Sequence, residues 1–194
     1  VILQPDFGTA ILLVFTASTM FFLAGAEVKQ VIVGGAVAVG TFGLLIANSH
    51  HARERIETFT RTLTDPSQAG YHLQQALIAL GSGGILGRGL GTSRQKLGYL
   101  PVPHTDSIFA VLGEEIGLLG CLLVIGLFAF LAYRGFKIAA QAADEFGALL
   151  AAGVTSWLVF EALLNMAVVT GVAPFTGVAL PFLSYGGSAL VSTM

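Results

Sequence analysis

The sequence predicts an all-helical membrane protein that crosses a bilayer about five times and carries one long polar loop. Of its 194 residues, 55% are hydrophobic and only 10% are charged, whereas about a quarter of an average soluble protein is charged. The mean hydropathy is +0.83. Twenty uncharged residues separate Asp6 from Glu27, and twenty-three separate Lys29 from Arg53. About twenty apolar residues cross a bilayer as a helix, and these runs lack the period of two that marks barrel strands.

The predicted spans follow the uncharged stretches. Eighteen uncharged residues precede Arg134, and no charge follows Glu161. Asp6 follows Pro5 at the start of the first stretch, where both residue types suit a helix N-terminus, so Asp6 is interpreted as structural or as a cavity residue. The spans are placed near residues 7–25, 29–47, 107–133, 146–170 and 177–194, with a polar loop over residues 48–106.

The polar loop holds ten of the twenty charged residues. Leu73, Leu77 and Leu80 recur at helical spacing, which predicts a short amphipathic helix over residues 71–80 that lies at the interface or packs on the bundle. The earlier part, from Arg53 to Asp65, is charged and rich in threonine, and only a supporting role is expected for it. The loop histidines other than His104 lack metal-ligand spacing and receive no role: His50, His51 and His72.

Residues 81–91 contain six glycines. This segment lacks the Gly-Lys-Ser/Thr ending of a phosphate-binding loop and does not join a strand to a helix. The glycines are therefore expected to permit backbone turns or close packing.

Two predicted spans contain carboxylates. Glu114 and Glu115 lie about two turns into the third span, and Glu161 lies in the fourth. Because a carboxylate that faces lipid is costly, at least one of the pair is expected to face a cavity, a partner or the membrane edge. Cys121, the single cysteine, is interpreted as a small packing residue.

Asp106 is the strongest catalytic candidate, because it lies where the polar loop meets a span. Partial desolvation there makes a carboxylate a better general base, although an aspartate at a helix start can also serve only as a cap. His104 could act as a base or a ligand, or be a solvated loop histidine. Three cations precede Asp106 and could bind an anionic group or lipid headgroups: Arg88, Arg94 and Lys96.

Several motifs together resemble one family. They run in order along the whole chain: Pro5-Asp6-Phe7-Gly8-Thr9, residues 87–101, His104-Thr105-Asp106-Ser107-Ile108-Phe109-Ala110, Gly113-Glu114-Glu115-Ile116-Gly117, and Pro181-Phe182-Leu183-Ser184-Tyr185-Gly186-Gly187-Ser188. This pattern closely resembles the SEDS (shape, elongation, division and sporulation) family, which contains FtsW, RodA and SpoVE. The contexts of residues 98–101 and 176–177 are closer to FtsW or SpoVE than to RodA.

The resemblance implies a peptidoglycan glycosyltransferase of the bacterial cytoplasmic membrane that polymerises lipid II during cell division or shape maintenance. It implies that Asp106 is the catalytic residue and that a class B penicillin-binding protein is the partner. The matching motifs also suggest substrate-binding residues and structural or cavity residues. The substrate-binding set is His104, Thr105, Arg88, Arg94, Gln95 and Lys96, and the structural or cavity set is Asp6, Glu114, Glu115, Ser184 and Tyr185.

The implied chemistry fits these residue types. An acceptor hydroxyl loses a proton as it attacks the anomeric carbon of the donor, and undecaprenyl diphosphate leaves from the opposite face in one inverting step. Such a step needs a base and a positive charge at the leaving group. Asp106 is the expected base, and the three cations or a divalent ion (Mg²⁺ or Mn²⁺) are the expected clamp. No tightly bound cofactor is expected.

The family pattern has three departures here. Gly98 stands where many FtsW-type members have an acidic residue, Thr176 where some have lysine, and Ser107 where an aromatic residue is common. The first two positions can therefore carry no charged role. Because the sequence begins with Val1 and ends inside a predicted span, it is expected to be a fragment of a longer protein, and the resemblance covers about the C-terminal half of a family member.

The resemblance places the polar loop outside the cytoplasm. The loop holds six Lys or Arg against three elsewhere, Lys29, Arg134 and Lys137, and a count of positive charges alone would place it inside. That rule weakens for loops of about this length, so the resemblance decides the orientation.

Two other functions compete with the transferase. A lipid II flippase or other transporter could use the three intramembrane glutamates as a proton relay, and a scaffold could recruit division proteins without catalysis. A transporter, however, does not explain the patterned loop that ends in Asp106. The chain lacks the sustained basic stretch that nucleic-acid binding requires.

Overall fold

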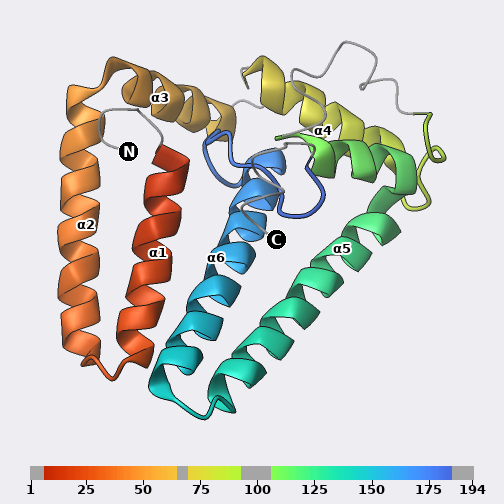
Figure 1. Cartoon of the computed structure of the whole chain (residues 1–194). Helices are drawn as coiled ribbons and strands as arrows, with labels where there is room; N and C mark the ends of the chain where they lie inside the picture. Colours follow the sequence, from red (N-terminus) through yellow and green to blue (C-terminus); the bar gives the residue numbers. More distant parts are fainter. Residues whose placement is uncertain (1–6, 65–69, 93–105, 185–194) are drawn as a thin grey trace. The chain divides into compact units, whose positions relative to one another are not determined.

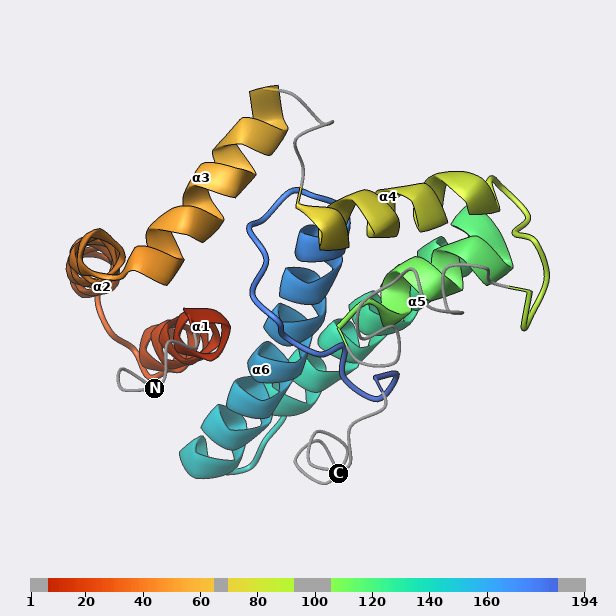
Figure 2. The same ribbon diagram turned by 90° about the horizontal axis from the view of Figure 1, so that it is seen from above.

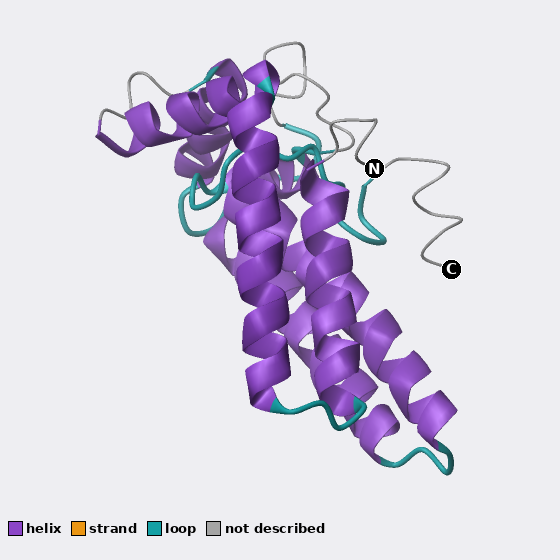
Figure 3. Ribbon diagram, turned by 90° about the vertical axis from the view of Figure 1, so that its left-hand side faces the viewer, coloured by secondary structure: helices purple, strands orange, loops and turns teal. Residues whose placement is uncertain are grey.

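In the computed structural model, the described residues, 7–64, 70–92 and 106–184, form helices joined by turns and contain no strand (Figure 1, Figure 3). The prediction of an all-helical fold is confirmed. The helices are α1 (Phe7–Leu23), α2 (Val28–Asn48), α3 (His50–Thr64), α4 (Tyr71–Gly83), α5 (Ile108–Ala140) and α6 (Glu145–Val169).

Two of the helices are long and apolar enough to cross a membrane, α5 and α6. The shorter apolar stretches Gly8–Leu23 and Val28–Thr41 coincide with the first two predicted spans. The fourth predicted span matches α6 to within one residue at each end, but α5 continues to Ala140 rather than ending near residue 133. The number of spans and the side of the membrane on which the loop lies stay predictions.

The last predicted span was wrong at its start. Residues 177–184 are not helical, because Gly177 and Phe182 have φ values of +68° and +64°, in the left-handed region that a right-handed helix excludes. The remainder of that span, residues 185–194, lies outside the described residues. The polar loop also differs from the prediction, since it contains α3 as well as the expected helix, α4.

By its internal contacts the chain divides into two compact units, residues 1–54 with 129–160 and residues 55–128 with 161–194. In the first unit, α1 and α2 form an antiparallel hairpin (Figure 1). Gln30 Oε1 accepts a hydrogen bond of 3.3 Å from the Glu27 amide at the start of α2, which is half of a capping box. Asp144 caps α6, since its Oδ2 accepts a bond of 2.8 Å from the Gly147 amide.

The second unit packs α4 and parts of α5 and α6 around one apolar core; Figure 2 shows α4 beside the start of α5. Small residues on all three helices let the backbones approach closely. The buried core members are Ala76, Ala79, Phe109, Ala110, Cys121, Val124, Phe128, Ala162, Met166, Val169 and Leu180. Cys121 is thus a buried packing residue, as predicted.

Helix α5 is interrupted at Gly117, which has φ +76° and ψ −165°. In a continuous helix the amides of Leu118 and Leu119 would donate to carbonyls one turn earlier in the same helix. Here Leu118 donates to the Gly84 carbonyl over 2.9 Å and Leu119 donates to the Ile85 carbonyl over 3.3 Å. The chain just after α4 therefore replaces the helix as acceptor.

The same segment also supplies donors for the carbonyls that the break releases. The Arg88 amide donates to the Glu114 carbonyl and the Gly89 amide donates to the Glu115 carbonyl, each over 3.0 Å. Residues 83–91, the glycine segment, thus exchange four hydrogen bonds with the break in α5. An apolar surrounding makes unsatisfied backbone groups expensive, so this exchange is what permits a broken helix there.

Glycine is required for this contact because the two backbones touch. A Cβ at Gly83 would collide with the Gly113 carbonyl, and a Cβ at Gly87 would collide with the backbone of Glu115. A Cβ at Gly117 would collide with the Gly87 amide. The predicted role of the glycines in turns and close packing is therefore confirmed, and α5 beyond Gly117 remains long enough to cross roughly 30 Å of hydrocarbon at 1.5 Å per residue.

We predict that Gly117→Ala destabilises the protein, because alanine must adopt a glycine-only conformation and push against the Gly87 and Ile85 backbone. The strain alone should cost about 1–3 kcal/mol, and the thermal unfolding midpoint of the purified protein should fall.

The matched control is Gly81→Ala, because Gly81 lies inside α4 with open space around its Cβ position. Alanine there should be neutral or stabilise by about 0.5–1 kcal/mol. Equal melting temperatures for the two variants would contradict the backbone contact.

Candidate active site

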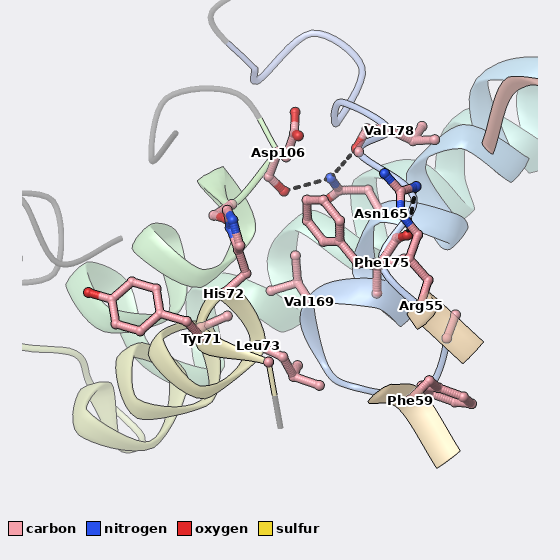
Figure 4. Close-up of a pocket in the computed structure, with 16 residues that line it drawn as sticks. Arg55, Phe59, Tyr71, His72, Leu73, Asp106, Asn165, Val169, Phe175 and Val178 are labelled. Carbon is pink, nitrogen blue, oxygen red and sulfur yellow. Dashed lines mark hydrogen bonds between the residues drawn. The ribbon is translucent and has the colours of Figure 1, made fainter. Parts of the chain in front are cut away.

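The second unit contains a pocket of about 150 Å³ that has Asp106 in its lining (Figure 4). A water needs roughly 10–15 Å³ by this measure, so the space suits a group of several non-hydrogen atoms. The walls come from α3, α4, the start of α5, the end of α6 and the chain that follows α6. The lining is mostly apolar: Arg55, Phe59, Gly70, Tyr71, His72, Leu73, Ala76, Asp106, Ser107, Asn165, Val168, Val169, Ala173, Phe175, Gly177 and Val178.

The chain turns back over the pocket because α6 ends in a Schellman motif. The Val172 amide donates to the Ala167 carbonyl over 2.8 Å and the Gly171 amide donates to the Val168 carbonyl over 3.1 Å. Gly171 has φ +77°, the conformation this motif requires. Residues 170–178, the return segment, then form one wall.

Asn165 joins the return segment to Asp106. Its Nδ2 donates to the backbone carbonyl of Asp106 over 2.9 Å and to the carbonyl of Val178 over 2.7 Å. Both partners are acceptors, which fixes the orientation of the amide. Asn165 is 2% exposed, so the two bonds form out of reach of competing water, and they hold Asp106 against the return segment (Figure 4).

Asp106 lies immediately before the first residues of α5. Ser107 is at the N-cap position, since its carbonyl accepts bonds from the amides of Ala110 and Val111 over 3.0 and 3.2 Å. The carboxylate of Asp106 points away from Asn165 (Figure 4), and a Cβ placed on Gly177 would lie 3.6 Å from Oδ2. Gly177 of the return segment therefore lies close to the Asp106 carboxylate.

The return segment also contacts α3 and α4. The His72 and Phe175 rings are tilted by 30° with centroids 5.0 Å apart. Arg55 Nη1 donates to the Phe175 carbonyl over 3.5 Å, a weak bond at that length. Phe175 thus connects two helices from the loop that precedes Asp106.

Arg88 lies elsewhere in the unit. Its Nη1 is 3.5 Å from Oε1 of Glu114, whose side chain is 1% exposed. Glu114 therefore faces a basic partner, and Arg88 is absent from the lining of the Asp106 pocket. Glu115 lies beside it with Oε1 buried and without a hydrogen-bond partner.

Other predicted site residues fall in two groups. Ser184 is buried, and its Oγ accepts a hydrogen bond of 2.7 Å from the Leu180 amide, so it stabilises the turn after the return segment. The second group lies outside the described residues and stays predicted: Asp6, Arg94, Gln95, Lys96, His104, Thr105 and Tyr185.

The described residues contain no cluster of side chains that could by itself coordinate a divalent ion. Within residues 7–64, 70–92 and 106–184, no three His, Cys, Asp or Glu side chains converge. Mg²⁺ and Mn²⁺ prefer oxygen ligands, and Asp106 is the one carboxylate that lines the pocket.

Sequence reasoning missed Asn165 and Arg55. Asn165 is the one side-chain amide within the predicted span 146–170, and polar groups within a span are a functional signal that could have identified it. Arg55 lies 51 positions before Asp106 in the sequence. Its proximity depends on how α3 and the return segment pack, which no local pattern reveals.

Two apolar helices of span length, and a pocket with Asp106 beside the start of one of them, are features of a membrane protein with a candidate active site at a helix end. The family model described as "Cell cycle protein" (FtsW/RodA/SpoVE) matches residues 1–194. The chain belongs to the FtsW/RodA/SpoVE family.

Individual relatives agree with this assignment. The chain is 50% identical over 193 residues to "Probable peptidoglycan glycosyltransferase FtsW" of Alkalilimnicola ehrlichii, covering 98% of this chain and 48% of the relative. It is 43% identical over 187 residues to "Stage V sporulation protein E" of Bacillus subtilis, covering 96% and 51%. The chain spans about half the length of the curated relatives it matches.

A solved structure has the same fold. It is described as "Structural coordination of polymerization and crosslinking by a peptidoglycan synthase complex", and one of its chains matches with a TM-score of 0.74 and 30% identity. The match covers 98% of this chain and 53% of the other.

We predict that Asn165→Leu, which keeps the size but removes the donor, destabilises the protein by about 1–3 kcal/mol. Asn165→Asp should be at least as damaging, because it places an oxygen against two carbonyls. Thermal unfolding of the purified variants measures both.

The control is Thr170→Val, since Thr170 Oγ1 bonds to the Met166 carbonyl over 2.8 Å within one turn; its loss should cost at most about 1 kcal/mol. If the Asn165→Leu protein had the same thermal unfolding midpoint as the wild type, the bridging role of Asn165 would be contradicted.

For the ion pair we predict unequal effects of its two halves. Arg88→Gln leaves the buried Glu114 carboxylate without its cation, whereas Glu114→Gln leaves a guanidinium whose side chain is 44% exposed and can turn to solvent. Arg88→Gln should therefore destabilise more, by about 1–3 kcal/mol given that partial exposure. The double variant should recover part of the loss in a thermal double-mutant cycle, and strictly additive losses would show that the two side chains do not interact.

Proposed function

We propose that the protein is a peptidoglycan glycosyltransferase that polymerises lipid II, with Asp106 as its general base. The observation that carries the proposal is the position of Asp106 at the edge of a mostly apolar pocket, with its backbone carbonyl bound to the buried Asn165. An anchored base in a largely apolar site is protected from competing water and needs little reorganisation during reaction. The names of the relatives, and of the solved synthase complex, support the same reaction class.

The proposed reaction is a single inverting displacement. Asp106 takes the proton of the acceptor sugar hydroxyl as that oxygen bonds to the anomeric carbon of the donor. The bond from the same carbon to the diphosphate oxygen breaks, and its electron pair leaves with undecaprenyl diphosphate. A base and a leaving group on opposite faces of the sugar convert an α-linked donor into a β-linked product.

The setting of the reaction is part of the proposal. The protein is placed in the bacterial cytoplasmic membrane as a multi-pass protein, with the Asp106 side outside the cytoplasm where lipid II is presented. The partner is a class B penicillin-binding protein, which would crosslink the new glycan strands. His104, Thr105 and Gln95 are proposed to contact the substrate, and Arg94 and Lys96 to contribute positive charge.

We predict that Asp106→Asn lowers lipid II polymerisation by about 10²–10⁴-fold, since a positioned general base contributes on that scale. The full-length protein that carries this segment, purified with its partner, should be assayed for glycan strands on a gel. Substrate binding should change far less than turnover, because asparagine keeps the shape of the side chain.

The matched control is Asp144→Asn at the start of α6, where asparagine caps a helix as well as aspartate does. This variant should polymerise at the wild-type rate. Full activity in Asp106→Asn would refute the proposed base. If the wild type moves lipid across vesicle membranes but makes no polymer, the result would instead support a transporter. If the wild type shows neither activity, the scaffold function would be supported.

A further inference from the structure

Arg55 brings a positive charge to the Asp106 pocket. Among the residues that line this pocket, Arg55 is the one arginine or lysine and Asp106 is the one aspartate or glutamate. Arg55 reaches the site from α3, and its guanidinium lies beside the return segment, on a different side from Asp106 (Figure 4). The pocket therefore carries one carboxylate and one guanidinium from distant parts of the sequence.

The charge of Arg55 is not neutralised by a neighbouring carboxylate of the described chain. On the same helix, Glu57 pairs with Arg61 at 3.7 Å. Within the described residues, Arg55 donates to the neutral Phe175 carbonyl, at 3.5 Å. A guanidinium has five N–H donors, so most of them remain for a ligand.

A guanidinium suits phosphate better than other anions of similar size, because its planar fork matches two phosphate oxygens at once. Arg55 is exposed on α3, so water partly screens this attraction, and the specificity for phosphate rests on the geometry of the fork. Phe59 and Phe175 line the pocket together with Arg55. Arg88, the described member of the three cations predicted to bind the leaving group, is instead paired with Glu114.

We propose that Arg55 binds the diphosphate of a polyprenyl-diphosphate-linked sugar in the Asp106 pocket. This rests on the proposed function, because the inverting transfer releases that diphosphate. The breaking bond leaves its electron pair on a diphosphate oxygen, and a cation there stabilises the charge that develops. Arg55 belongs to α3, whereas Asp106 lies two residues before the start of α5, so the base and the cation come from separate segments that line one pocket.

The first test measures polymerisation by the full-length protein with its partner. Arg55→Gln should lower kcat/KM for lipid II by about tenfold to a hundredfold, the scale of a charge-assisted hydrogen bond. Arg55→Lys should recover part of the loss, because it restores the charge but not the fork. Arg61→Gln is the matched control on the same helix, since Arg61 is absent from the lining, and it should match the wild type.

The second test separates the ligand from the reaction. Binding of polyprenyl diphosphate, polyprenyl monophosphate and the uncharged alcohol is measured in nanodiscs on an Asp106→Asn background. Arg55→Gln should weaken diphosphate binding by about tenfold or more while alcohol binding stays constant. Nanodiscs with and without phosphatidylglycerol distinguish the substrate phosphate from a lipid headgroup.

Three results would overturn the inference: Arg55→Gln behaving as Arg61→Gln, equal weakening of diphosphate and alcohol, or dependence on phosphatidylglycerol alone. Failure of the proposed function looks different. If Asp106→Asn polymerises normally but diphosphate binding still requires Arg55, the base is wrong and the phosphate site stands.

Discussion

The second unit depends on an exchange of backbone hydrogen bonds between the break in α5 and the glycine segment. Four bonds replace those that a continuous helix would form, so the break leaves these amides and carbonyls satisfied in an apolar setting. The exchange holds the end of α4 against α5, and it places Arg88 within reach of the buried Glu114. The contact leaves no room for a side chain at Gly83 and Gly87 of the segment or at Gly117 of α5.

The site is built on a second set of backbone contacts, centred on Asn165. One amide group bridges Asp106, two residues before α5, and the return segment that follows α6. Because the return segment also contacts α3 and α4 through Phe175, four helices meet around one pocket. Buried amide bonds of this kind specify a single arrangement, since any alternative leaves polar groups unsatisfied.

These contacts assign different tasks to the basic residues of the loop. Arg88 compensates a buried carboxylate, whereas Arg55 reaches the Asp106 pocket. A count of positive charges before Asp106 treats the two alike. The environment separates them, because a cation that is paired within the protein has less to offer a ligand than one whose nearest acceptor is a neutral carbonyl.

The sequence by itself determined the all-helical class, the positions of α1, α2 and α6, the helix around residues 71–80, the packing role of the glycines and the family. These features follow from local hydropathy, helical spacing and ordered motifs, which need no knowledge of distant contacts. It also selected Asp106, although its catalytic role stays a prediction. Only the tertiary structure decided that residues 177–184 are not helical, that α3 lines the pocket, and that Asn165 and Arg55 accompany Asp106. The positions of Asn165 and Arg55 depend on hydrogen bonds between segments up to 120 positions apart, and such pairings arise from packing rather than from local pattern.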